Sequence, residues 1–341
     1  MKKFIIITLL FSIVTSGVFA QLTFSGSVYA GVQVEIPWDS DEDATAGAYH
    51  RVEGVPQFNL VTTFTRANSG VRLDTTFRGD FQGEGSVTVD GIYGWADFLD
   101  NTLRLSLGRI SDAVWIGNID PDNLVYFDKV TGLRLEYATP LPGLSVGAAF
   151  RFEGSNFGQV FERVILGANF VHPMFNAVFA YNVGANGHAL FGFNFTGIPD
   201  LTAAALQVRA THLASWDDPG FGGVLELKQR VGFRVLRPLT VSLFMGQTIF
   251  AEPRGDFAGR DMELFFTPGV SYIVQPGLTA SFTAEFRSYD YFDRSRFITL
   301  TPGIELMLTG GTVLYAQYEL VLGRYIHQSG HRIGMGLEFR F

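Results

Sequence analysis

The sequence has no cysteine, little charge and almost no long apolar run. Without thiols the chain can form no disulfide, bind no cysteine-ligated zinc and use no cysteine nucleophile. Charged residues make up 17% of the 341 residues and hydrophobic residues 47%, whereas an average soluble domain has about 25% charged residues. Beyond the N-terminal region no apolar stretch approaches the roughly 20 residues of a membrane-spanning helix. These absences exclude a helical membrane protein. They leave a large all-β protein or one whose apolar side chains face lipid.

The single apolar run lies at the N-terminus and predicts export. Lys2 and Lys3 precede the apolar segment 4–14, and Val18-Phe19-Ala20 supplies small residues at the usual positions of a cleavage site. The run is too short to anchor the chain in a bilayer, so we interpret residues 1–20 as a cleaved signal peptide and 21–341 as a single mature domain. The formal net charge of −8 argues against a nucleic-acid partner, which requires a basic surface.

From residue 22 onward the apolar residues recur at every second position, which is the period of a β-strand. The segments 22–36, 278–287 and 312–322 each place apolar residues on one face and polar or charged residues on the other. A strand with two such faces separates a dry environment from a wet one. The pattern therefore predicts strands that lie between lipid or core and water.

Turn signals rich in Pro, Gly and Asn alternate along the chain with mostly longer polar connections. Strands of about 9–11 residues, an even strand number and this asymmetry of connections are typical of a transmembrane barrel. We predict an all-β fold, a closed antiparallel transmembrane β-barrel of about 18 strands, with short periplasmic turns and longer external loops; about 16 strands is the alternative. A secreted β-solenoid or sandwich would also alternate. A solenoid would show a sequence repeat, and a sandwich of this size would be unusually large.

The last strand indicates which membrane the barrel is inserted into. Its apolar positions end in Phe339 and Phe341 and alternate with small or charged residues. This resembles the C-terminal signature by which the barrel-assembly machinery recognises outer-membrane proteins. The resemblance implies that Phe339 and Phe341 form the assembly signal, that this machinery is a partner, and that the protein lies in the bilayer of the bacterial outer membrane. Strands at both ends also let the first and last pair, leaving no open edge.

Two stretches resemble the Gram-negative porin family. One is YGWADFLDNTLRLSLGRI, residues 93–110, and the other is TGLRLEYATPLPGLSVGAAF, residues 131–150. The resemblance implies a porin, and a homotrimer as one form of assembly. It also implies that the connection after the Gly-Arg strand folds into the barrel and narrows it. That connection is 111–128 here, and it lacks the Pro-Glu-Phe-Gly-Gly stretch usual in the family.

The charged residues fall mostly on the polar face of the strands, where a channel would use them for selectivity. Apart from the signal peptide the only lysines are Lys129 and Lys228, so the basic residues are nearly all arginines. Structural ion pairs between neighbouring strands are the alternative role. The candidates for the pore lining or constriction are Asp74, Arg78, Arg104, Arg134, Arg163, Arg209, Lys228, Arg230, Glu285 and Arg287 in or beside strands, with Asp120 and Asp122 in the connection 111–128.

Other motifs are weak, and we expect no metal, no cofactor and no enzymatic activity. Asp39, Asp41 and Asp43 resemble the start of a calcium loop, but Ala44 stands where that motif needs Gly. The histidines are scattered, and the sequence shows no nucleophile elbow or phosphate-binding loop. The aromatic residues fit the lipid face and its interfacial girdles.

These features predict a water-filled channel for passive diffusion of small hydrophilic solutes and ions. One alternative is a substrate-selective channel, for example for sugars. Another is a surface adhesin that uses the acidic external loops, in particular segments 37–57 and 111–129.

Overall fold

A computed structural model describes residues 20–39, 42–51, 54–79, 85–110, 130–152, 164–183, 187–195, 197–211, 224–250, 262–289, 296–308, 310–323 and 329–341. Residues 1–19, which belong to the predicted signal peptide 1–20, lie outside this set. Among the described residues, no helix has the length and apolarity needed to cross a membrane.

The secondary structure consists of strands. They are β1 (Ala20–Pro37), β2 (Thr45–Ala48), β3 (Gln57–Arg66), β4 (Ser69–Gly79), β5 (Gly85–Phe98), β6 (Leu103–Ile110), β7 (Val130–Ala138), β8 (Leu144–Arg151), β9 (Val164–His172), β10 (Phe175–Val183), β11 (His188–Phe195), β12 (Leu201–Thr211), β13 (Val224–Leu236), β14 (Leu239–Phe250), β15 (Met262–Gln275), β16 (Leu278–Tyr289), β17 (Arg296–Met307), β18 (Thr312–Leu322) and β19 (Gly330–Arg340).

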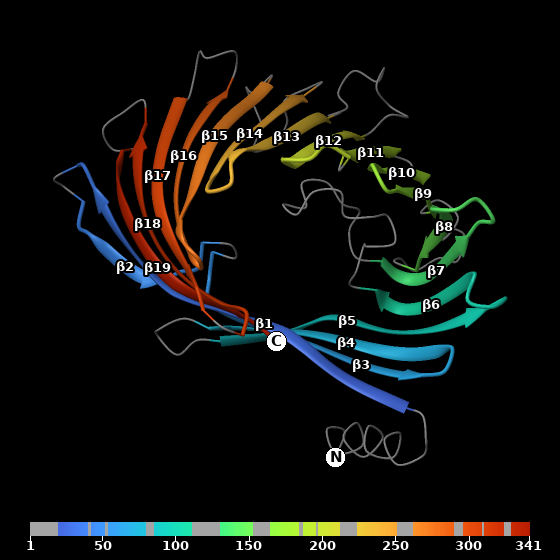
Figure 1. Ribbon diagram of the computed structural model, residues 1–341. Coiled ribbons are helices and arrows are strands. Elements are labelled where there is room, and N and C mark those ends of the chain that lie inside the picture. Colours follow the sequence, from blue (N-terminus) through green and yellow to red (C-terminus); the bar gives the residue numbers. More distant parts are fainter. Residues whose placement is uncertain are drawn as a thin grey trace.

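The strands close into one antiparallel barrel (Figure 1). From β3 to β19 each strand pairs with the next, and β1 completes the ring by pairing with both β3 and β19. The four-residue strand β2 adds to the edge of β1, where Ala48 pairs with Val32. The wall therefore has 18 strands, which confirms the larger predicted number and shows that 16 is wrong. Closure gives every wall strand two neighbours, which is the condition for a sheet in lipid.

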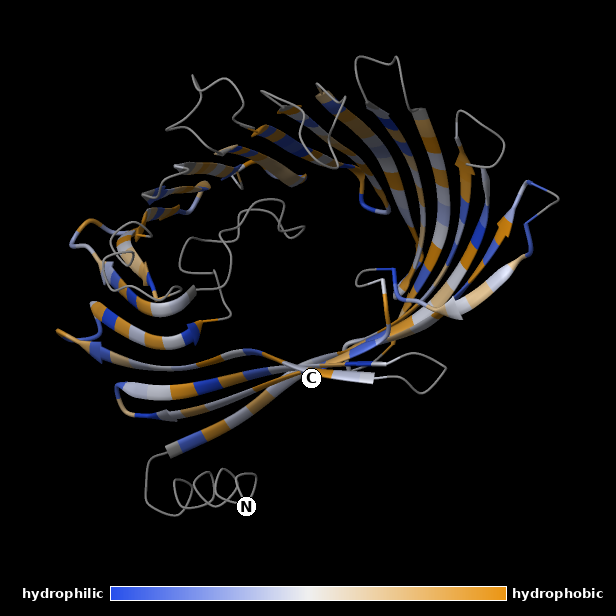
Figure 2. Ribbon diagram, turned by 180° about the vertical axis from the view of Figure 1, so that it is seen from behind, coloured by the Kyte–Doolittle hydropathy of each residue, from blue (hydrophilic) through white to orange (hydrophobic). Residues whose placement is uncertain are grey.

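Alternate residues of each strand face opposite sides of the wall, and Figure 2 shows the resulting bands of polar and apolar residues along the strands. In β1 the exposed large apolar residues Leu22, Phe24 and Val32 share one parity. Tyr29, of the opposite parity, is buried. The predicted two-residue period is confirmed, with the apolar parity on the outside of the barrel.

Short turns connect the strands at one end of the barrel. Gly143 and Gly277 occupy two of them with φ of +84° and +83°, a region that favours glycine. A Cβ on Gly143 would lie 2.1 Å from the carbonyl oxygen of Val171, so this turn has no room for a side chain. Most of the longer connections lie partly or wholly outside the described residues.

The strand β1 is staggered between its two neighbours. Its first half, from Ala20 to Tyr29, pairs with β3, and its second half, from Ser27 to Pro37, pairs with β19. The backbone N–H and carbonyl of Phe341 both bond to Gly26, at 3.1 and 3.0 Å. The Phe341 ring stacks on Phe339, with 5.8 Å between centroids. Phe339 and Phe341 are thus built into the closing seam of the barrel, and their role as an assembly signal stays a prediction.

Candidate functional site

The strand register places the predicted pore-lining residues on the inner face. Residues directly opposite each other in a ladder share a face, so Glu136 lies beside Arg104 and Glu226 beside Arg209. The same parity continues around the ring, opposite to that of the exposed apolar residues. The described candidates on the inner face are Asp74, Arg78, Arg104, Arg134, Arg209, Lys228, Arg230, Glu285 and Arg287. Asp120, Asp122, Arg163 and the whole connection 111–128 lie outside the described residues.

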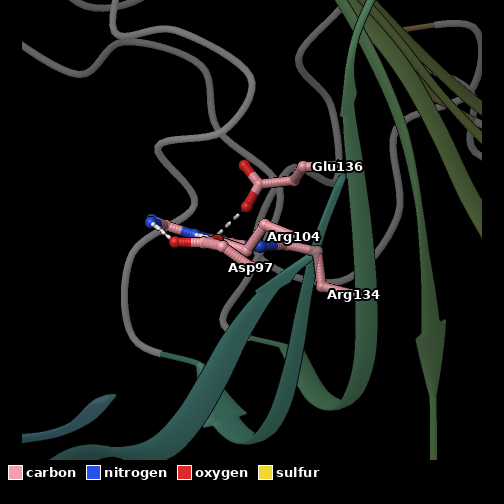
Figure 3. Close-up of polar contacts among 4 residues, drawn as sticks. All are labelled: Asp97, Arg104, Arg134 and Glu136. Atoms are coloured by element: carbon pink, nitrogen blue, oxygen red, sulfur yellow. Dashed lines mark hydrogen bonds and ion pairs between the residues drawn. The ribbon is translucent and has the colours of Figure 1, made fainter. Parts of the chain in front are cut away.

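On β5 to β7 the charged residues form close local pairs (Figure 3). Arg104 donates from Nε and Nη2 to the two carboxylate oxygens of Asp97, at 2.7 and 2.8 Å. Arg134, which is only 5% exposed, donates to Glu136 at 3.3 Å. The Arg104 guanidinium also lies 5.7 Å from the ring centre of Trp95. A guanidinium that binds a carboxylate through two bonds is fixed in orientation as well as in charge.

The neighbouring strand β4 presents one paired and one more open arginine. Arg72 donates to Asp74 at 2.7 Å. Arg78 is exposed and donates to the amide oxygen of Gln57 at 3.2 Å, and no carboxylate among the described residues pairs with it. Its positive charge is therefore exposed to the lumen, at the end of β4 that precedes the connection to β5.

A second charged sector covers β12 to β16. Glu226 binds Arg209 and lies 3.9 Å from Lys228. Arg287 pairs with Glu285 at 3.1 Å and with Glu263 at 3.5 Å. Here, as on β5 to β7, each carboxylate takes its cation from its own strand or an adjacent one. The ion pairs left open as an alternative role are thus present at most candidate positions.

A cluster of buried apolar side chains lies between the two charged sectors. Its side chains have the inner parity, since Ala149 lies directly opposite Arg134. They are almost completely buried and pack against one another: Ala149, Ile165, Val178, Ala180 and Leu190, with Ala205 at the border. The inner wall therefore differs in polarity around its circumference.

The fourth sector, from β17 through β19 to β1, contains residues that sequence reasoning did not select. His50 is fully buried, with its ring between those of Tyr29, at 4.7 Å, and Tyr315, at 5.2 Å. Burial lowers the pKa of His50. Arg51 binds Glu305, which is 254 positions away in the sequence. No local pattern could have shown this contact.

Several aromatic residues also differ from expectation. Tyr29, Trp95, Phe244, Phe265 and Tyr315 have the inner parity, so assigning the aromatics to the lipid face was wrong for them. Phe244 and Phe265 each have an arginine guanidinium over the ring, Arg230 at 5.1 Å and Arg287 at 5.9 Å. Such contacts hold the cation above an apolar surface.

The weak metal candidates lie at the start of the connection after β1. Asp39 and Asp43 are described and Asp41 is not. Within the described part of the chain, no group of three or more His, Asp or Glu side chains is placed to hold a metal ion.

Comparisons with known proteins establish the fold. The sequence matches no known family model and no curated protein. The structure is similar to OccAB3 of Acinetobacter baumannii, with a TM-score of 0.63 and 12% identity over 94% of this chain and 99% of that one. It is also similar to OccK10 (OpdN) of Pseudomonas aeruginosa, with a TM-score of 0.57 and 11% identity over 93% and 99% of the two chains. An anion-selective porin from Comamonas acidovorans matches with a TM-score of 0.52 and 14% identity over 94% and 100%. The barrel thus has the fold of bacterial outer-membrane porins.

Proposed function

We propose that the protein is a water-filled channel for passive diffusion of small hydrophilic solutes and ions across the bacterial outer membrane. The main support is the contrast between the two faces of one closed wall. Charged pairs line the inside, whereas large apolar side chains are exposed on the outside. A barrel of about 16 to 18 strands leaves an aqueous channel.

The inner charges would favour polar solutes over apolar ones. Paired arginines and carboxylates keep strong dipoles fixed in the wall, and these dipoles orient water that an apolar solute would have to displace. Arg78 adds an exposed positive charge without a carboxylate among the described residues. The candidate pore-lining residues therefore act mainly as a fixed polar lining, and Arg78 adds a positive charge that no carboxylate of the described residues pairs with.

The test is single-channel recording with purified protein in planar lipid bilayers. We expect stepwise currents that are proportional to voltage, because an open lumen conducts at either polarity. The matched control is the same preparation after heat denaturation, which must give no steps. Absence of steps from folded protein, at concentrations where a known porin inserts and conducts, would refute the proposal.

A substrate-selective channel, for example for sugars, is the second candidate. The inner-face rings of Trp95, Phe244 and Phe265, each beside an arginine, favour it, since sugar rings pack on aromatic faces and bond to guanidinium groups. Liposome swelling with solutes of equal size separates the candidates. A general channel admits sugar stereoisomers and amino acids at equal rates, and a selective one discriminates. Surface binding without any conductance would instead support the adhesin reading.

The remaining partners are proposed with this function. The outer apolar face would contact the lipid bilayer of the outer membrane, and the barrel-assembly machinery would recognise the strand that ends in Phe339 and Phe341. Chains could assemble as a homotrimer. Replacing Phe341 by Ala tests the second point, since the amount of folded barrel in the outer membrane should fall while synthesis of the chain is unchanged.

A further inference from the structure

Glu305 is paired differently from the other carboxylates of the inner wall. Those with ion pairs among the described residues find a cation on the same strand or on a neighbouring one. Glu305 lies in β17, opposite Thr279 of β16 and Tyr315 of β18, and neither neighbour is basic. Its cation is Arg51, which belongs to the connection between β2 and β3.

The chain reaches Glu305 because this connection turns into the barrel, where it is seen within the ring of strands (Figures 1 and 2). The strand β2 first pairs with β1, and the backbone N–H of Tyr49 continues that pairing with a bond to the carbonyl of Gly31 at 3.0 Å. His50 then lies between the inner-face rings of Tyr29 and Tyr315. The segment Tyr49 to Arg51 is therefore a docked part of the inner wall.

Two wall glycines make room for this segment. A Cβ on Gly31 would lie 2.4 Å from the carbonyl oxygen of Tyr49, and a Cβ on Gly336 would lie 2.6 Å from the hydroxyl of Tyr315. Real Cβ atoms do not approach other atoms this closely. The absence of side chains at these two positions thus forms a docking site: Gly336 leaves space for the Tyr315 ring, and Gly31 leaves space for the backbone of Tyr49.

Arg51 is held by three contacts in this docking site. Its backbone N–H donates to the Tyr315 hydroxyl at 3.0 Å, its guanidinium lies 4.4 Å above the Tyr315 ring, and its Nη1 binds Glu305. The side chains of Arg51 and Glu305 are 23% and 39% exposed, so both charges remain in contact with the lumen. While both charges are present, each neutralises the other. When one is removed, the remaining charge is exposed enough to attract or repel ions in the lumen.

We propose that Arg51 is a selectivity-determining residue, delivered into the lumen by the connection after β2 to neutralise Glu305. This inference rests on the channel function proposed above. With Arg51 docked, Glu305 attracts few cations from the lumen. Without Arg51, the same carboxylate is a negative charge whose ladder neighbours in the described wall, Thr279 and Tyr315, carry no positive charge.

The charge role is tested by reversal potentials in a potassium chloride gradient. We expect Arg51→Gln to shift the permeability ratio toward cations by about twofold, because one unscreened unit charge is added to the wall. Arg51→Lys keeps the charge and should stay at the wild-type value. The matched control Arg237→Gln removes the same charge from the exposed turn between β13 and β14, on a different part of the wall, and should also leave the permeability ratio unchanged. Heat-modified mobility on gels confirms that each variant is folded.

The anchoring role is tested by open-channel current noise. Glu305→Gln releases the guanidinium and should increase the noise. Glu285→Gln, a carboxylate whose arginine lies on the same strand, should leave the noise unchanged. Equal noise in the two variants, or an unchanged reversal potential in Arg51→Gln, would overturn the inference although the channel function stands. A wild-type protein that does not conduct would overturn both.

Discussion

The wall from β5 to β7 and the wall from β17 to β1 show two ways of fixing charge inside a barrel. In the first, Asp97 and Arg104 face each other across one hairpin, so the pair forms as soon as the hairpin does. In the second, Glu305 receives its cation from Arg51, 254 positions away. The first kind of pair depends only on strand register. The second depends on a connection that enters the lumen and contacts strands far away in the sequence.

The largest effect is expected where the local wall is buried. Arg134→Gln removes the buried guanidinium that bonds to Glu136 and leaves this carboxylate only the more exposed Arg104 across the ladder, which we expect to lower the free energy of unfolding by about 2 kcal/mol. This is less than for a fully buried pair, since the Glu136 side chain is 23% exposed. Urea unfolding in detergent micelles measures it. Arg104→Gln is the control, and because Arg104 is 46% exposed its loss should cost about 0–1 kcal/mol. An equal decrease in the free energy of unfolding for the two variants would show that the burial of Arg134 does not determine its contribution to stability.

The next effect concerns ion selectivity on the local wall. Neutralising Arg78 and Arg134 together should shift the reversal potential toward cations, by about twofold in permeability ratio. Most of the shift should come from Arg78, which is exposed, whereas Arg134 is buried beside Glu136. The single variants Arg78→Gln and Arg134→Gln separate the contributions. An unchanged potential in the double variant would remove Arg78 from the pore lining.

A smaller effect is expected from pH on the docked wall. Burial is the main cause that lowers the pKa of His50; Glu338 opposes it and Arg51 acts in the same direction, and the rings of Tyr29 and Tyr315 pack against the imidazole. Above about pH 6.5 the His50 imidazole is neutral in both the docked and the released segment, so the docking equilibrium does not change with pH. Below that pH the released form binds a proton first, and docking weakens until the pH reaches the lowered pKa. Open-channel noise should therefore rise as the pH falls from about 7.5 to 5.

The control for this pH effect is His50→Gln, which cannot titrate. Its noise should not depend on pH over the same range. If the variant keeps the acid-induced rise, another group is responsible and His50 does not control the docking.

The smallest effect comes from fixing β2 in place. Val32 and Ala48 are directly opposite, a spacing that a disulfide can bridge, and the chain has no other thiol. Oxidised Val32→Cys/Ala48→Cys should show an internal disulfide by gel mobility with conductance unchanged. The pair Val32→Cys/Ala46→Cys is out of register and should not form one. A disulfide in both variants would show that β2 does not hold a fixed register on β1.

The barrel and its polar lining could be predicted from sequence because both depend on a two-residue period. That period specifies which residues share a face, and it placed Arg104, Arg209 and Arg287 on the inner wall. The general assignment of the aromatic residues to the lipid face was wrong for Phe244 and Phe265, because an inner ring can be accommodated beside a glycine such as Gly246. No periodicity in the sequence indicates the contact of Arg51 with Glu305. This contact depends on the path of an irregular connection through a closed barrel, which composition and spacing do not encode.

The stagger of β1 has a kinetic consequence. Its two halves pair with strands from opposite ends of the chain, so the ring closes only when both ends are present. Contacts this distant in sequence form slowly, and open strand edges aggregate while they wait. Between synthesis and closure, the first and last strands therefore expose unpaired edges that other chains can pair with. The backbone bonds between Gly26 and Phe341 belong to the pairing that removes these edges.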